Sequence, residues 1–355
     1  MNSCGPRGDS RGSILILVFF ILVSMSLFSL TVGYVVRQKM QVISRLETRQ
    51  KLRLIGEAAV RKSIYVLLSH KQGRVPYDAL TQLWSRNEPE FHDVKINGGE
   101  FSVSYSSELP SGKAGAIEPE LRYGLKDEER KININRIKSS DVLRRLFLEV
   151  GVKGNDQARS LAEAILDWRD EDDDASLSGA ESYYYKGLKP PYLPRNGAFQ
   201  TLQELRGVKG MTDELYKKLL PYVTIESSGL VNLNTASRPV LVALGLDAAL
   251  CNKIVAFREG RDRIDGTKDD LAFEDLDSAP QALANSGYLD NNEKAHLKAA
   301  IQSGAFTLSS ENFSSQVLAQ LKYKKQGLRI LAVFDEKGVI KHWEEEFVVL
   351  PLSSS

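Results

Sequence analysis

The stretch SILILVFFILVSMSLFSLTVGYVV, residues 13–36, decides the fold of this 355-residue chain. It contains no charged side chain. An α-helix rises about 1.5 Å per residue, so a helix of this length crosses the hydrocarbon core of a bilayer. The sequence therefore predicts a transmembrane helix over residues 13–36.

The residues before this helix are polar and basic. They include Arg7 and Arg11 and end with Gly12, and no cleavable small-residue motif follows Val36. This pattern resembles the leader of type IV prepilins, in which a prepilin peptidase cuts after the glycine and methylates the new terminal amine. We expect cleavage between Gly12 and Ser13, with the apolar helix retained. An uncleaved signal anchor is the alternative.

The fifth residue after that cleavage point is Leu17. Most pilins and pseudopilins carry a glutamate there, thought to neutralise the terminal ammonium of the neighbouring subunit inside the membrane, where an unpaired charge is costly. A subunit without this glutamate has no such partner above it. Leu17 therefore suits the first subunit of a filament, at its tip.

The rest of the chain changes from helix to strand, to helix and back to strand. No proline lies between Pro6 and Pro76, and apolar residues continue at helical spacing, so one helix should extend to about residue 70. Residues 91–108 and 121–135 alternate as strands do, residues 136–304 are mostly helical, and strand character returns over residues 328–350, where Lys337 and Gly338 can close a hairpin.

We therefore predict an α+β fold in which a pilin-like antiparallel sheet domain is interrupted by a large inserted all-helical domain. Two separate sheets are the alternative. The hydrophobic content of 42% and charged content of 26% are typical of a folded protein. The expected parts are a prepilin leader (1–12), the transmembrane helix (13–36), its periplasmic continuation (37–70), the two parts of the pilin-like domain (71–135 and 306–355) and the insertion (136–305).

The most specific motif lies in the helical region, over residues 164–225. It is similar to the pattern of the protein K family of minor pseudopilins in type II secretion, Asp-Trp-x-Asp-x-Asp-Asp, then Gly-Ala-Glu, Tyr-Tyr, Pro-Pro-Tyr, Asn, Glu-Leu and Gly-Met-Thr. The matching residues are Asp167, Trp168, Asp170, Asp172, Asp173, Gly179, Ala180, Glu181, Tyr184, Tyr185, Pro190, Pro191, Tyr192, Asn196, Glu204, Leu205, Gly210, Met211 and Thr212.

This resemblance implies a non-enzymatic assembly protein at the pseudopilus tip, where it initiates or caps assembly for protein export across the outer membrane. It implies a single-pass protein of the bacterial inner membrane with most of its chain in the periplasm. The implied partners are the I and J minor pseudopilins, other pseudopilins, the inner-membrane secretion platform and the prepilin peptidase. A minor pilin of a type IV pilus is the milder alternative.

Acidic side chains crowd residues 167–181, where they repel one another unless a cation or a basic partner neutralises them. Oxygen ligands with no His or Cys nearby favour calcium, and calcium in the inserted domain of K relatives points the same way. A solvated acidic loop is the alternative, since no EF-hand spacing is present. The candidate ligands are Asp167, Asp170, Asp172, Asp174 and Glu181, with Glu181 closing the site from the far end of the loop.

A second acidic stretch surrounds Gly266 and is interleaved with basic residues. It is a weaker candidate for a cation site. Its acidic residues are Asp262, Asp265, Asp269 and Asp270.

Residues 229–261 resemble a helix-hairpin-helix unit of the kind that binds DNA. The turn contains Gly245, and Asp247 places a negative charge where a phosphate would lie, which disfavours nucleic acid. A membrane-tethered receptor for DNA uptake is nevertheless the competing function from a different class.

The chain does not carry the motifs of an enzyme. His70, His92, His296 and His342 are scattered without metal-binding spacing, and there is no nucleophile elbow or phosphate-binding loop. The cysteines are Cys4 and Cys251, so removal of the leader leaves Cys251 alone, and we expect it to be buried rather than in a disulfide.

Overall fold

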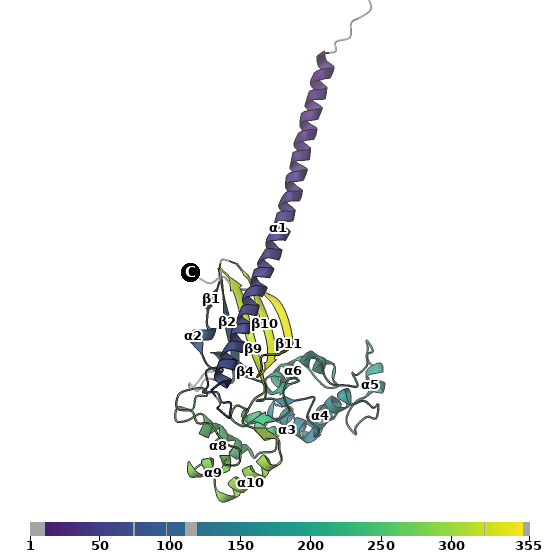
Figure 1. The fold of residues 1–355 in the computed structure, drawn as a ribbon. Helices are drawn as coiled ribbons and strands as arrows, with labels where there is room; N and C mark the ends of the chain where they lie inside the picture. The colour runs from purple at the N-terminus through teal and green to yellow at the C-terminus, as the bar shows by residue number, and fades with distance from the viewer. Residues whose placement is uncertain (1–10, 74, 97, 111–118, 323, 351–355) are drawn as a thin grey trace, which may run out of the picture. The chain divides into compact units, whose positions relative to one another are not determined.

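A computed structural model describes residues 11–73, 75–96, 98–110, 119–322 and 324–350 (Figure 1). The chain divides into two compact units, residues 1–54 and 55–355. The first contains most of α1 (Arg11–Lys71), one uninterrupted helix that ends one residue beyond the expected point. Its N-terminal part is long and apolar enough to cross a membrane. Gly12 and Ser13 fall in the first turn of α1, whereas residues 1–10 of the expected leader lie outside the described residues.

The second unit is built on one antiparallel sheet, as predicted. The strands follow the order β1–β2–β9–β10–β11, while β3 pairs with β2 and β4 pairs with β9. Pairing of Gly99 with Leu321 and of Val103 with Val317 joins the strands that precede and follow the insertion. The sheet consists of β1 (Val94–Ile96), β2 (Gly99–Pro110), β3 (Pro119–Tyr123), β4 (Lys126–Asp127), β9 (Asn312–Leu321), β10 (Gln326–Asp335) and β11 (Ile340–Val349).

The hairpin between β10 and β11 forms where the sequence predicted it. The amide of Gly338 donates to the carbonyl of Asp335 at 2.8 Å. Gly338 has a φ of 83°, a conformation that glycine adopts without strain. This turn places β11 at the end of the sheet.

The C-terminal part of α1 covers one face of the sheet. Ile55, Ala59 and Leu67 are buried. A Cβ added at Gly56 would lie 2.3 Å from Cδ1 of Ile330, so the absence of a side chain lets the helix approach β10 closely. The hydroxyls of Ser63 and Ser315 lie 3.0 Å apart and join the helix to β9.

The insertion surrounds its own hydrophobic core, which runs from Ile132 to Leu308. In contrast to the all-helical domain expected, it also contains loops and two parallel strand pairs. β5 at the entering border pairs with β6 in the middle of the insertion, and β7 in the middle pairs with β8 at the returning border. Its elements are β5 (Ile132–Asn133), α3 (Ser140–Glu149), α4 (Asn155–Arg169), α5 (Ser182–Lys186), η1 (Leu202–Gly207), α6 (Asp213–Leu219), η2 (Leu220–Tyr222), β6 (Val223–Thr224), β7 (Val231–Asn232), α7 (Arg238–Ala243), α8 (Ala248–Arg258), α9 (Ala279–Asn285), α10 (Asn291–Gln302) and β8 (Phe306–Thr307); α2 (Glu88–Phe91) precedes the sheet.

A buried polar network joins the sheet to the insertion. The carboxylate of Asp127 accepts from Asn232 at 3.2 Å, from Thr235 at 2.5 Å and from Ser310 at 2.8 Å. Glu129 accepts from the amide and the side chain of Asn312. Burial raises the pKa of Asp127 to about 6, and burial together with Asp127 raises that of Glu129 to about 8. These hydrogen bonds fix the position of the segments through which the chain enters and leaves the insertion.

Candidate metal centre

The acidic loop is anchored where α4 ends. Asp167 is fully buried in the last turn of that helix. Its Oδ1 accepts from the hydroxyl of Ser176 at 2.6 Å, and its Oδ2 accepts from the amides of Ser176 at 3.1 Å and Ala180 at 2.8 Å. A Cβ added at Gly179 would lie 1.9 Å from Oδ2 of Asp167. Asp167 thus holds the loop closed, and position 179 has room only for a glycine.

The framework around the loop is also fixed. The ring of Trp168 packs edge-on against Tyr185, with 5.1 Å between the ring centroids. Lys209 donates to the carbonyl of Gly179 at 2.9 Å and lies 5.2 Å from the centre of the Tyr184 ring. The amide of Ser178 donates to Glu163 at 2.7 Å. These contacts position the far end of the loop against α4.

Three carboxylates come together inside this frame. Ligand atoms of Asp167, Asp170 and Glu181 all lie within 4.8 Å of one another. Glu181 is 3% exposed, and neither of its carboxylate oxygens accepts a hydrogen bond from any described residue. The buried Oδ1 of Asp170 likewise has no partner in that part of the chain. Burial, then Asp170 and Asp167, raises the pKa of Glu181 to about 7, and burial, then Asp172, raises that of Asp170.

The donor set fits a hard divalent cation. Buried carboxylate oxygens are costly unless they are paired, and the neighbouring Arg169 donates to the carbonyls of Ile134 and Ile137 rather than to these carboxylates. An oxygen-only set of this kind suits calcium better than a transition metal. Asp170 and Glu181 would be the principal ligands, while Asp167 has both oxygens engaged with the loop.

The other two predicted ligands lie elsewhere on the loop. Asp172 and Asp174 are exposed and are not part of this group. Oδ1 of Asp172 accepts from the amide of Asp174 at 2.9 Å, which forms a local turn. Asn196 was not predicted as a ligand. Its Nδ2 donates to the carbonyl of Asp172 at 3.0 Å, and its buried Oδ1 has no partner among the described residues.

The second acidic loop has a different structure. Ligand atoms of Asp262, Asp269 and Asp270 lie within 4.8 Å of one another. Oδ2 of Asp269 accepts from the amides of Arg261 and Asp262, and Asp270 accepts from the amide of Gly266, so these oxygens are largely satisfied by the loop itself.

Asp265, the fourth candidate in this loop, is not part of that group. Its carboxylate lies 3.6 Å from the guanidinium of Arg122 in β3, and both side chains are nearly buried. The charge of Asp265 is therefore neutralised by a basic residue of the sheet and not by a metal ion.

The helical hairpin is formed by α7 and α8. The carboxylate of Asp247 accepts from the amides of Ala249 at 2.8 Å and Leu250 at 3.4 Å. It therefore occupies the helix N-terminus that a phosphate would need. Cys251 is buried one turn further on, as expected, and burial raises its pKa to about 12.

The chain is similar to proteins of type II secretion. The family model "Type II secretion system (T2SS), protein K" matches residues 129–227, which include the acidic loop. A type II secretion system protein K of Aeromonas hydrophila is 34% identical over 176 residues, 47% of this chain and 50% of that protein. That of Pseudomonas aeruginosa is 29% identical over 284 residues, 75% of this chain and 77% of that protein. Residues 129–227 therefore carry the protein K domain of the type II secretion system.

A solved structure shares the fold of this K-family chain. A chain of the crystal structure of the GspK-GspI-GspJ complex from the enterotoxigenic Escherichia coli Type 2 Secretion System matches with a TM-score of 0.61 and 19% identity, and the match covers 86% of this chain and 99% of that one. The α+β pseudopilin fold expected from the sequence is thereby confirmed. The chain is a minor pseudopilin.

Proposed function

We propose that this K-family chain is the tip subunit of the pseudopilus and that it initiates or caps assembly for protein export across the outer membrane. Three observations support this proposal: the family, the apolar helix that opens the chain, and Leu17 at the fifth position after the expected cleavage point. A carboxylate at that position would need the terminal ammonium of a subunit above it, and leucine needs none. The family, which restricts the chain to the pseudopilus, is the observation that carries the proposal.

The proposed immediate partners are the I and J minor pseudopilins. The solved chain with the same fold belongs to a GspK-GspI-GspJ complex, which motivates the assignment. Other pseudopilins and the inner-membrane secretion platform would be met during assembly. The transmembrane segment would be held in the inner membrane, with the sheet and the insertion in the periplasm.

Entry into this pathway would require cleavage by the prepilin peptidase. We propose a cut between Gly12 and Ser13, followed by methylation of the new amine. The retained mature chain would begin at the first residue of the apolar stretch.

The acidic loop is proposed to bind calcium. The cation would supply the positive charge that lets Asp170 and Glu181 be ionised together. Asp167 would hold the loop in place through Ser176 and Ala180, and Gly179 would let the loop close. Calcium would thus order the outer end of the insertion. The chain has no proposed catalytic role.

The proposal is tested by producing the chain together with the prepilin peptidase and the I and J minor pseudopilins. We expect an intact mass that lacks residues 1–12 and carries one added methyl group, and co-purification of the chain with I and J in detergent. An unprocessed N-terminus, or a processed chain that purifies without I and J, would contradict the assignment.

A further inference from the structure

The last strand of the sheet has an open edge. β11 (Ile340–Val349) pairs with β10 along one side, and none of the described residues pairs with its other side. Figure 1 shows it at the outer side of the sheet. Every second residue of such a strand directs its amide and carbonyl outward, where they can pair with another chain. The opposite edge is formed by β1, which is only three residues long.

The side chains of β11 give this edge a distinct character. Its ends are apolar and exposed, with Ile340 at 45% and Val349 at 81%. Its centre is acidic, because Glu344, Glu345 and Glu346 follow one another. Glu345 accepts a hydrogen bond from Nε1 of Trp343 at 3.0 Å, and the guanidinium of Arg329 lies 3.6 Å from Glu346 in a pair that is mostly exposed and therefore weak.

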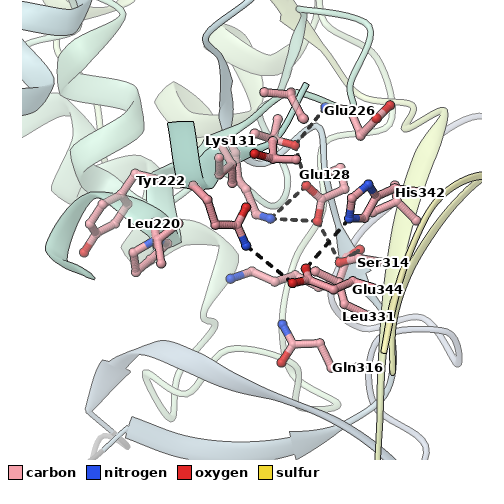
Figure 2. A pocket seen from close by; sticks show the side chains of 18 of the residues that line it. Glu128, Lys131, Leu220, Tyr222, Glu226, Ser314, Gln316, Leu331, His342 and Glu344 are labelled. Atoms are coloured by element: carbon pink, nitrogen blue, oxygen red, sulfur yellow. Dashed lines mark hydrogen bonds and ion pairs between the residues drawn. The ribbon is translucent and has the colours of Figure 1, made fainter. Parts of the chain in front are cut away.

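A cavity of about 590 Å³ lies beside the acidic centre, between the sheet and the insertion (Figure 2). Cross-strand neighbours form its floor, because Leu331 of β10 is opposite both Gln316 of β9 and Glu344 of β11. Leu220 and Tyr222 of η2 line it from the insertion. The cavity therefore extends across the sheet as far as the edge strand.

The mouth of the cavity is polar. Glu344 lies 3.9 Å from Nε2 of His342, and the amide of Gln203 donates to it at 3.5 Å. Deeper inside, Glu128 accepts from Lys131, Thr224 and Ser314, so its charge is fully compensated. Glu344 is thus a half-exposed carboxylate of the cavity that belongs to the edge strand itself, whereas Glu226 lines the cavity from the insertion.

We propose that the edge of β11 and this cavity together bind an extended segment of a partner protein that carries lysine or arginine at alternate positions. The segment would add to the sheet as a strand beside β11. Main-chain hydrogen bonds would hold it, and a side chain next to Glu344 would reach the cavity mouth, as in other cases of strand addition. This proposal does not rest on the tip location proposed above.

The charges argue against a second copy of this chain as the occupant. Two copies of β11 paired edge to edge in register would place glutamates opposite glutamates, and like charges directly opposite one another destabilise a strand pair. A basic segment with its cationic side chains at alternate positions instead gains from Glu344 and Glu346, which lie on the same face of β11. The acidic centre therefore disfavours self-association and favours a basic partner.

The test uses the full-length chain in detergent micelles and a fluorescein-labelled ten-residue peptide that alternates valine with lysine. We expect saturable binding by fluorescence anisotropy at low salt, and slower hydrogen exchange of the β11 amides when the peptide is bound. A peptide of the same sequence with alternate amide nitrogens methylated keeps its charge but cannot pair with a strand. It should not bind.

Two double variants distinguish binding of the peptide at the edge of β11 from nonspecific attraction between charges. Glu344→Gln with Glu346→Gln should weaken binding about fivefold, as expected for the loss of two exposed ion pairs. Asp213→Asn with Glu214→Gln makes the same change in net charge on exposed side chains of α6 and should leave binding unchanged. Glutamine keeps the shape of glutamate, and both variants should retain the unfolding temperature of the parent chain.

Any of four results would overturn the proposal: equal binding of the methylated peptide, unchanged exchange at β11 in the complex, equal affinity of the two double variants, or concentration-dependent dimerisation of the chain without peptide.

Discussion

Glu181 combines burial with crowding by other acids, and this combination distinguishes it from the other carboxylates of the loop. Its two oxygens have no hydrogen-bond donor in the described part of the chain, whereas those of Asp167 have three. Such a group either holds a proton or binds a cation. The following two predictions test these alternatives.

Replacing Glu181 by glutamine should abolish stabilisation by calcium. In the parent chain a saturating calcium concentration, 100 times the dissociation constant, should add about 2.7 kcal/mol to the free energy of unfolding. Glu181→Gln should lose this gain without loss of calcium-free stability, because a buried charge is removed. The matched control is Asp174→Asn, on an exposed residue of the same loop, which should keep the gain. Urea unfolding of each protein, once with calcium and once with a chelator, measures this gain. If Glu181→Gln is still stabilised by calcium, the proposed site is wrong.

The pH dependence of the calcium-free chain follows from the same residue. The pKa of Glu181 is raised from its ordinary value of 4.5 to about 7, so the folded state holds the proton more tightly than the unfolded state. Its contribution to stability is therefore fully present below pH 4.5 and is lost as the pH rises through 7.

We expect the parent chain to lose more stability than Glu181→Gln over that interval when no calcium is present, as measured by urea unfolding at successive pH values. The comparison is needed because the raised pKa values of Asp127 and Glu129 act in the same direction in both proteins. Parallel curves for the two proteins would show that Glu181 is not perturbed.

The loop between α4 and α5 depends on close approach of its backbone to Asp167. An alanine at Gly179 would place Cβ 1.9 Å from Oδ2 of Asp167, so the loop or the helix end must move. Gly179→Ala should lower the free energy of unfolding by about 1–3 kcal/mol, as overpacking of a buried site does. Gly197→Ala is the control, since its nearest neighbour would be 3.8 Å away. Equal stability of the two variants by urea unfolding would show that the loop closes differently.

The N-terminal part of α1 carries the argument for the tip. Leu17→Glu would restore the carboxylate that other pseudopilins use to pair with the ammonium of a neighbouring subunit. We expect secretion by a strain that depends on this chain to fall at least about tenfold, because an unpaired buried charge costs more than 1.4 kcal/mol. Secretion assays and a membrane-fraction blot measure the effect. Leu15→Met is the control, and normal secretion by Leu17→Glu would remove the charge-pairing argument.

The elements with a strong apolar periodicity could be predicted from the sequence, whereas the polar strand β9 could not. β9 was not recognised, although it is the central strand that joins β2 to β10. Its buried hydroxyls conceal the apolar pattern, since Ser314 donates to Glu128 at 2.6 Å and Ser315 lies against Ser63 of α1. Such residues look exposed in a sequence because their partners are distant along the chain.

The acidic site was predictable in its residue types and not in its geometry. Crowding along the chain pointed equally to Asp170, Asp172 and Asp174, but the turn that Asp172 makes with the amide of Asp174 leaves both exposed. In the second loop, the partner of Asp265 is Arg122, more than a hundred residues away. Neither contact has a local sequence signal.

At the scale of the whole molecule, the sheet and the insertion are joined by buried polar groups rather than by a flexible linker. Asp127 and Glu129 in the entering segment bind Ser310 and Asn312 in the returning one. Because both crossings share one network, the insertion is held at a defined position on the sheet. The position of the insertion is therefore fixed by the sheet.

The location of this chain along the pseudopilus distinguishes a tip subunit from a subunit of the filament body. Pseudopili assembled by the complete system can be labelled with gold-conjugated antibodies raised against the insertion and viewed by electron microscopy, with a strain lacking the chain as the control. A tip subunit places the gold at one end of each filament, and this is the result that we expect. Gold distributed along the filaments, or filaments of normal number and length without label at either end, would contradict it.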